Sequence, residues 1–580
     1  TTMTSTSTRP WLGTYPEGVP ADISAGPYRS LVQLLEDSFR QHAQRTAYSF
    51  MGKDITYAET DSLSEAIAAY LQSLGLTKGD RVALMMPNVP QYPVAVAAVL
   101  RAGLVVVNVN PLYTPRELEH QLNDSGAKAI FILENFAHTL AQCLARTDVR
   151  HVILTAMGDR LGLLKGSLVN HVVRHVKKMV PAYQLPQAVR FNEALARGTR
   201  LTLKRPDIRP DDVAVLQYTG GTTGVSKGAV LLHSNIIANA LQSEAWNAPA
   251  MKTIPAGQQP TSVCALPLYH IFAFTVNMML GLRMGGKVIL IPNPRDLKAV
   301  LKELSRHTFH SFPAVNTLFN GLVHHPDFHT VDWSHLKVSL GGGMAVQSAV
   351  AKLWLEKTGC PIVEGYGLSE TSPSACCNPV TSHTFSGTIG VPIPGTWLRC
   401  LDDDGNDVAP GQPGEIAIKG PQVMAGYWQR PDETAKVMTA DGYFKTGDIG
   451  VMDAQGFFRI VDRKKDMVLV SGFNVYPNEV EEVVASCPGV LECAAVGIPD
   501  HKTGEAVKLV IVKQDPDLSE AQVRSFCQAN LTGYKQPKVI EFRSDMPKTP
   551  VGKILRRELR DKKPAPMYLH PPTMSVASAQ

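Results

Sequence analysis

Short, strongly apolar runs separated by stretches with helical periodicity constrain this chain most. Residues 81–86 (RVALMM), 104–109 (LVVVNV) and 129–133 (AIFIL) are the clearest runs, and they are typical of strands that are buried on both faces. Residues 94–102, between the first two runs, show a helical pattern. Because strands of this kind occur in parallel sheets covered by helices, the pattern predicts an α/β fold for the large N-terminal portion.

The pattern changes twice farther along the chain. The 580 residues exceed the ~250–300 at which a single core stops growing. From about residue 395, short strands alternate with turn sequences such as 404–406 (DGN), which predicts a β-rich subdomain. After a charged run at 462–466 (DRKKD), the remaining pattern predicts a small α+β domain with strands at 467–470, 494–498, 507–512 and 539–543 and helices at 479–485 and 520–529.

Composition excludes several classes of protein. Hydrophobic residues make up 44% and charged residues 19% of the chain, which rules out a disordered protein, and a net charge of +5 gives no strong field for nucleic acid. The nine cysteines have no regular spacing, which argues against a disulfide framework or a zinc site. The most apolar stretch, 92–107, is shorter than the ~20 residues of a membrane span. We therefore expect a soluble, cytoplasmic protein.

A glycine-rich loop at residues 218–228 (YTGGTTGVSKG) is the strongest local signal. Its glycines allow close approach of the backbone to a ligand, and its hydroxyls and Lys227 can donate to phosphate oxygens. It is not a Walker A loop, because Ser226 precedes Lys227 where that motif requires glycine. The apolar run at 229–232 predicts that the loop joins two strands. The alternative is a glycine-rich hairpin without a ligand.

This loop and four later segments together resemble the adenylate-forming superfamily, which includes acyl-CoA synthetases, nonribosomal adenylation domains and firefly luciferase. The later segments are 365–370 (GYGLSE), similar to the adenine and magnesium motif, 443–448 (YFKTGD), similar to the ribose motif, 462–466, similar to the hinge, and 547–553 (PKTPVGK), similar to the segment with the catalytic lysine. Residues 442–465 resemble the signature of fatty acyl-CoA synthetases. The whole chain, including 110–117 (NPLYTPRE), resembles the bacterial long-chain fatty acid–CoA ligases.

The resemblance implies activation of long-chain fatty acids to acyl-CoA through an acyl-adenylate, for fatty acid uptake and β-oxidation. The implied co-substrates are ATP and coenzyme A, and the implied cofactor is Mg²⁺. AMP and pyrophosphate are the by-products. Lys553, Thr219 and Glu370 would be catalytic, and Glu370 and Thr219 would hold the metal. The residues implied to bind ATP or AMP are Thr219, Gly220, Gly221, Thr222, Thr223, Gly224, Lys227, Gly343, Glu364, Gly365, Tyr366, Gly367, Ser369, Asp448 and Arg463. Ser369 stands where threonine is common, but it keeps the hydroxyl.

The resemblance also divides the chain into functional parts. It implies a lead-in at 1–25, a large adenylation domain at 26–462, a hinge at 463–466 that pivots on Lys465, a small mobile domain at 467–570, and a tail at 571–580. After adenylation, rotation about the hinge would withdraw Lys553 and form a coenzyme A tunnel, which the resemblance places at Ser471, Gly472 and Phe473. The acyl pocket is assigned to His270, Gly341 and Gly342.

A basic helix is predicted at residues 168–180 (LVNHVVRHVKKMV). Valines at 169, 172, 173, 176 and 180 lie at helical spacing, and basic residues fill much of the remaining face. Such a helix can lie on an anionic bilayer, which would give peripheral association with the inner membrane. The alternative is that it packs on its own domain.

Two other functions remain open from the sequence. The chain could load a fatty acid onto a carrier protein, or it could be a membrane module that binds fatty acids without catalysis. The sequence also leaves a homodimer open.

Overall fold

The computed structural model describes residues 9–24, 26–219, 226–471, 473–531, 533–550 and 552–560. The chain divides into two compact units. The first runs to Lys465 and includes Pro550–Lys553, and the second comprises Asp466–Thr549 and resumes at Ile554. The division falls inside the predicted hinge. Within the described ranges, none of the helices combines the length and the hydropathy that crossing a bilayer requires.

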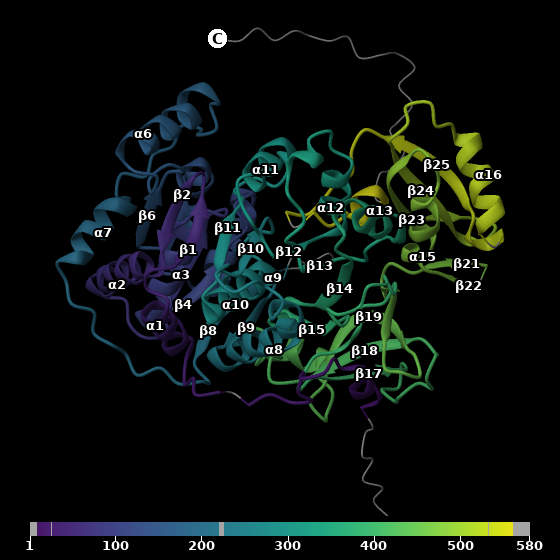
Figure 1. The fold of residues 1–580 in the computed structure, drawn as a ribbon, viewed down its shortest axis with the longest axis horizontal. Coiled ribbons are helices and arrows are strands. Elements are labelled where there is room, and N and C mark those ends of the chain that lie inside the picture. Colours follow the sequence, from purple (N-terminus) through teal and green to yellow (C-terminus); the bar gives the residue numbers. More distant parts are fainter. Residues whose placement is uncertain are drawn as a thin grey trace, which may run out of the picture. The chain divides into compact units, whose positions relative to one another are not determined.

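A seven-stranded sheet forms one layer of the first unit, in the order β7-β6-β5-β3-β4-β8-β9. Of its strands, β4, β6, β8 and β9 are labelled in Figure 1. Neighbouring strands are parallel except for β8 and β9, which are antiparallel. The strands are β3 (Arg81–Met85), β4 (Val105–Asn108), β5 (Ala129–Leu133), β6 (His151–Thr155), β7 (Val189–Arg190), β8 (Val213–Tyr218) and β9 (Gly228–Leu232). The strands predicted from the apolar runs are confirmed, and so is the pair that flanks the glycine-rich loop.

Alternate residues of these strands face two separate hydrophobic cores. Val82 and Leu84 pack into the core shared with the nine-stranded sheet, whereas Ala83 and Met85 pack with helices α4 (Pro115–Ser125) and α5 (Ala137–Ala141). Helix α3 (Gln91–Arg101) is buried along its whole length and lies against α2 (Tyr57–Ser73). Strands buried on both faces explain the continuous apolar runs, so the α/β prediction is confirmed.

A nine-stranded sheet forms the second layer, in the order β16-β15-β14-β13-β12-β10-β11-β1-β2. Strands from β14 to β1 in this order are parallel, and the two edges are antiparallel. The strands are β1 (Thr46–Phe50), β2 (Lys53–Thr56), β10 (Thr261–Cys264), β11 (Lys287–Leu290), β12 (Ser311–Ala314), β13 (Val338–Gly341), β14 (Ile362–Gly367), β15 (Ser374–Cys377) and β16 (Val391–Pro392). Helices α1 (Leu31–Gln41), α8 (His233–Met251), α10 (Leu280–Met284), α11 (Leu297–Leu304), α12 (Asn316–Val323) and α13 (Ser348–Thr358) belong to the same unit.

The β-rich subdomain predicted from about residue 395 is a four-stranded antiparallel sheet. Its strands, in sheet order, are β17 (Trp397–Leu401), β18 (Gly414–Lys419), β19 (Phe444–Met452) and β20 (Phe458–Arg463). Leu398 and Ile416 of this sheet share a hydrophobic core with Ala375 and Val391 of strands β15 and β16. The sheet is thereby attached to the edge of the nine-stranded sheet.

The second unit contains the predicted α+β elements, although Pro550–Lys553, which was predicted to belong to this domain, groups with the first unit. Its sheet has the order β22-β21-β24-β23, and β25 pairs in parallel with β24. The elements are β21 (Val468–Val470), β22 (Phe473–Val475), α15 (Pro477–Ala485), β23 (Val490–Asp500), β24 (Gly504–Lys513), α16 (Glu520–Asn530) and β25 (Pro537–Arg543). Val480 of α15 and Val523 of α16 pack with Leu509 and Ile511 of β24. Every element predicted after the charged run is present.

The helix predicted at 168–180 has different bounds, and part of it packs on its own domain, which the sequence had left open. Helix α6 spans Leu163–His171 and continues as a π-helical turn at Val172–Val176. Val173 is buried and Val169 packs against the main core, so part of the predicted valine stripe faces its own domain. Arg174 contacts the buried carboxylate of Glu134 at 2.6 Å, which holds this side of the helix to the domain.

Candidate active site

Three predicted motifs meet at Asp448, which is 5% exposed. The Tyr366 hydroxyl donates to Asp448 Oδ2 at 2.5 Å, and Arg463 Nε lies 3.2 Å from Asp448 Oδ1. Strand pairing explains part of this arrangement, because Asp448 of β19 lies directly opposite Arg463 of β20. Burial, followed by the Asp448 charge, raises the pKa of Tyr366 well above its usual value, so Tyr366 remains a neutral donor.

Glu370 lies in the short turn after strand β14 and is 8% exposed. The Tyr427 hydroxyl donates to Glu370 Oε2 at 3.1 Å. The ring of Tyr427 also lies 4.6 Å from Lys227 Nζ, which in turn is 3.3 Å from Glu433 Oε2. Burial is the main cause of the raised pKa of Glu370. Tyr427 therefore contacts both the predicted metal ligand and the predicted phosphate-binding lysine.

The two ends of the glycine-rich loop are hydrogen-bonded to each other. The Thr219 N–H donates to the Lys227 carbonyl at 3.0 Å, and the Ser226 hydroxyl donates to the Thr219 carbonyl at 2.6 Å. Gly220, Gly221, Thr222, Thr223 and Gly224 lie outside the described residues. Thr219 and Lys227 are thus placed at the base of the loop, where strands β8 and β9 meet.

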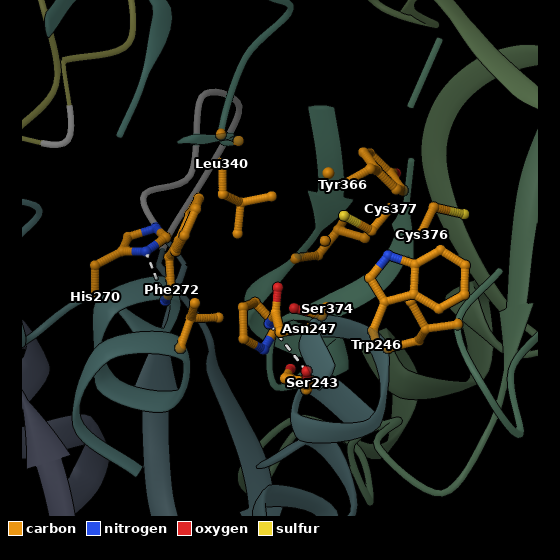
Figure 2. Close-up of a pocket in the computed structure, with 18 residues that line it drawn as sticks. Ser243, Trp246, Asn247, His270, Phe272, Leu340, Tyr366, Ser374, Cys376 and Cys377 are labelled. Carbon is orange, nitrogen blue, oxygen red and sulfur yellow. Dashed lines mark hydrogen bonds between the residues drawn. The ribbon is translucent and has the colours of Figure 1, made fainter. Parts of the chain in front are cut away.

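A pocket with a cavity volume of about 60 Å³ lies beside the predicted adenine motif (Figure 2). The pocket is lined by Ser243, Trp246, Asn247, His270, Phe272, Val276, Leu340, Gly342, Gly343, Gly365, Tyr366, Gly367, Leu368, Pro373, Ser374, Cys376, Cys377 and Ile393. The structure therefore brings His270, Gly342, Gly343 and the 365–367 segment to one cavity, as their assignment to neighbouring subsites requires.

A side chain at either of two glycines of the pocket wall would meet a neighbouring atom. A Cβ on Gly342 would lie 2.3 Å from Phe272 Cε2, and a Cβ on Gly367 would lie 2.0 Å from the Pro373 carbonyl oxygen. Gly341 is not in the lining, and a Cβ there would meet Val346 at 2.4 Å. The Glu364 carboxylate accepts a hydrogen bond from the Val346 N–H. At Gly367 the obstructing atom belongs to the backbone, so a side chain does not fit there, whereas at Gly342 and Gly341 a neighbouring side chain would have to move.

His270 is neutral at physiological pH. Burial lowers its pKa to about 4, and the charge of Lys553 is the second cause. The His270 Nδ1 accepts the N–H of Phe272 at 3.2 Å, which orients the ring along the pocket (Figure 2). Within the same unit, the Thr317 hydroxyl donates to the Gly552 carbonyl at 2.9 Å, and Gly552 has φ +84°. The residue before Lys553 therefore adopts a conformation that favours glycine.

Of the predicted hinge and tunnel residues, Lys465, Ser471 and Phe473 lie at exposed positions. Lys465 is exposed and lies in the turn between β20 and β21. The Ser471 N–H donates to the Thr503 carbonyl at 2.8 Å, and Phe473 is 58% exposed and stacks on Tyr534 with ring centroids 4.9 Å apart. Gly472 lies outside the described residues. The roles of these residues stay predictions.

Sequence reasoning missed the pocket wall that helix α8 contributes. Ser243, Trp246 and Asn247 lie at positions i, i+3 and i+4, so they share one helix face. Cys376 and Cys377 of β15 were missed as well. The helical spacing was the only local signal, and it does not distinguish a ligand pocket from core packing.

Comparison with known proteins agrees with this geometry. Residues 35–428 match the family of AMP-binding enzymes, and residues 479–553 match the AMP-binding enzyme C-terminal domain. The long-chain-fatty-acid–CoA ligase of Escherichia coli O157:H7 is 54% identical over 553 residues, which cover 95% of this chain and 98% of that protein. The protein of the same name from Haemophilus influenzae is 50% identical over 97% of this chain and 99% of its own, and that of Bacillus subtilis is 38% identical over 96% and 98%.

Solved structures show the same fold. An anthranilate CoA ligase, AuaEII, in complex with anthranoyl-AMP superimposes with a TM-score of 0.81 at 23% identity, covering 93% of this chain and 98% of that one. ATP-bound MatB from Rhodopseudomonas palustris gives a TM-score of 0.76 at 28% identity, covering 91% and 98%. The chain therefore belongs to the AMP-binding enzyme family, within which it groups with the long-chain-fatty-acid–CoA ligases.

Proposed function

We propose that this chain activates long-chain fatty acids to acyl-CoA through an acyl-adenylate, with ATP and coenzyme A as co-substrates. One observation carries the proposal: the predicted adenine motif forms a wall of a pocket that is otherwise largely apolar (Figure 2). Adenylation requires a nucleotide and an acid to react across a short distance. A shared wall between Tyr366 and apolar residues such as Phe272 and Leu340 supports that geometry.

The reaction has two displacement steps. A carboxylate oxygen of the acid attacks the α-phosphorus of ATP, the bond to pyrophosphate breaks, and an acyl-adenylate forms. The sulfur of coenzyme A then attacks the acyl carbon, the thiol proton is lost, and AMP leaves. Both steps build negative charge, so cations and donors that are already in place accelerate them.

The residues of this chain take distinct parts in these steps. Asp448, held by Tyr366 and Arg463, accepts hydrogen bonds from the ribose hydroxyls. Lys227 binds the phosphates of ATP, and Lys553 stabilises charge where the carboxylate meets the α-phosphate. Rotation about Lys465 then removes Lys553 before thioester formation.

Mg²⁺ fits the residues present at Glu370. In the described part of the chain, no group of three or more His, Cys, Asp or Glu side chains is arranged to hold a metal ion. Mg²⁺ commonly binds through one or two carboxylates together with substrate phosphates. Glu370 would supply the carboxylate and Thr219 a hydroxyl. When bound, the ion neutralises charge on the phosphate oxygens.

Pyrophosphate release with oleate and ATP tests the function. We expect release that depends on both substrates, and AMP release on addition of free coenzyme A. Lys553→Ala should abolish adenylation, measured by hydroxylamine trapping of the acyl-adenylate. Pyrophosphate release without any response to free coenzyme A would favour loading of a carrier protein. An absence of pyrophosphate release with every fatty acid would favour a module that only binds lipid.

Peripheral membrane association is part of the proposal, through the face around helix α6. Its apolar side chains are unusually exposed: Leu163 and Leu164 are 90% exposed and Leu168 is 64% exposed. Lys177 and Lys178 are exposed close by in the sequence. Exposed leucines next to basic residues favour the surface of an anionic bilayer, where a fatty acid would be dissolved.

Vesicle co-sedimentation tests this face. Replacement of Leu163, Leu164 and Leu168 by serine should reduce binding to anionic vesicles, whereas Leu355→Ser on α13, where Leu355 is 37% exposed, is the control. Equal binding by both variants would contradict the assignment. A homodimer stays a prediction, which sedimentation velocity would test.

A further inference from the structure

We infer that Trp246 closes the end of the acyl pocket and limits the length of acid that the enzyme accepts, an inference that rests on the proposed function. His270 and Trp246 lie on opposite sides of the cavity (Figure 2). The carboxylate end of the acid belongs on the His270 side, because the charge of Lys553 acts on His270. The hydrocarbon chain therefore extends from His270 towards the indole of Trp246.

The indole is held firmly and cannot move aside at low cost. Trp246 is 2% exposed, and its Nε1–H donates to the Asn378 carbonyl at 3.0 Å. Asn378 is itself fixed, because its side-chain amide donates to the carbonyls of Glu364 at 3.1 Å and Thr388 at 2.7 Å. Rotation of the indole would leave a buried N–H without its acceptor.

A second ring supports Trp246 on a side that does not line the pocket. Tyr15 packs edge-on against the indole with ring centroids 5.0 Å apart, and its hydroxyl donates to the Pro392 carbonyl at 2.5 Å. Tyr15 does not belong to the pocket lining. The wall is therefore two aromatic rings deep, and a smaller side chain in place of the Trp246 indole would extend the cavity towards Tyr15.

The position of Trp246 on helix α8 allows the opposite change to be tested as well. Ser243 lies three residues earlier on the same helix face and also lines the pocket. A larger side chain at Ser243 would fill the cavity next to Trp246 without disturbing the indole hydrogen bond. Enlarging and reducing the same region should thus shift chain-length preference in opposite directions.

The test is kcat/KM for a series of saturated acids from octanoate to docosanoate, measured by pyrophosphate release. Burial of each methylene favours binding about fourfold. Trp246→Ala should raise kcat/KM for acids longer than palmitate relative to kcat/KM for palmitate. The expected rise in this ratio is roughly fifteenfold for each two additional methylenes that the enlarged pocket accommodates, and Trp246→Phe should give a smaller rise. Ser243→Leu should lower the same ratio and favour shorter acids. Trp354→Phe, a fully buried tryptophan outside the pocket, is the control for general loosening of the core.

The outcomes separate this inference from the proposed function. A uniform loss at all chain lengths in the Trp246 variants, or an unchanged profile in Trp246→Phe and Ser243→Leu, would overturn the inference while leaving the ligase activity of the unmodified enzyme intact. Failure of the unmodified enzyme with every acid would instead overturn the proposed function. If Trp246→Ala does not fold, as judged by thermal unfolding, Trp246→Phe and Ser243→Leu decide the matter.

Discussion

Removal of one hydroxyl group tests how the site holds Glu370. Tyr427→Phe deletes the donor that lies 3.1 Å from Glu370 Oε2 and keeps the ring that lies 4.6 Å from Lys227 Nζ. Glu370 is 8% exposed, so water can replace the lost donor only in part. A hydrogen bond to a charged group contributes roughly 1.5–3 kcal/mol. Since about 1.36 kcal/mol corresponds to a factor of ten, we expect kcat/KM for ATP to fall roughly 10- to 150-fold, with KM for the fatty acid unchanged.

Tyr57→Phe is the matched control. The Tyr57 hydroxyl is also buried, but its acceptors are the carbonyls of Gly281 and Gly286, at 3.0 and 2.6 Å, rather than a predicted site residue. In thermal unfolding, Tyr57→Phe should lose roughly 1 kcal/mol of stability and Tyr427→Phe roughly 1.5–3 kcal/mol, because only the second removes a hydrogen bond to a charged group. Only Tyr427→Phe should weaken binding of MgATP in calorimetric titration. A folded Tyr427→Phe variant with the unmodified kcat/KM for ATP and the unmodified MgATP affinity would show that this hydroxyl does not hold Glu370 for nucleotide binding.

Three further predictions concern the nucleotide motif, the pocket and the core. Asp448→Asn, which keeps the size of the side chain but loses its charge, should raise KM for ATP at least about tenfold in the pyrophosphate assay, and an unchanged KM would exclude ribose binding there. Gly342→Ala would displace the Phe272 ring, which lines the pocket, since the added Cβ lies 2.3 Å from it. It should lower kcat/KM for long acids more than kcat/KM for octanoate, and equal losses of kcat/KM would contradict this. Burial lowers the pKa of His233 from 6.5 in the unfolded chain to about 4 in the folded one. The contribution of His233 to the free energy of unfolding is therefore fully present above pH 6.5 and decreases as the pH falls from 6.5 towards 4, because only the unfolded chain takes up the proton in this range. Denaturant unfolding at about pH 7 and about pH 5 should show this fall, and His233→Asn should reduce it; identical pH dependence in both proteins would count against His233.

The local sequence pattern was sufficient to predict most of the helices and strands. The strand at residues 129–133 was predicted with its observed bounds, because five consecutive apolar residues between polar ones suit a strand buried on both faces. The strand pair beside the glycine-rich loop was also predicted, since the turn residues and the apolar runs lie next to each other in the sequence. Helix α6 shows where this reasoning fails. Valine spacing predicted an apolar face, but it could not tell that Val173 would pack inwards while Leu163 and Leu164 would stay exposed.

The sequence by itself determined the order of the motifs, the α/β class and the identities of residues such as Asp448 and Glu370, because these depend on residue type and local spacing. Only the tertiary structure decided which side chains complete the site. Tyr427 contacts Glu370 across 57 residues of sequence, and Trp246 donates to Asn378 across 132. Such contacts arise where strand order and helix packing bring distant segments together, and no periodicity within either segment encodes the partner. The same apolar helix face can therefore cover a core or line a pocket until the fold determines what lies opposite it.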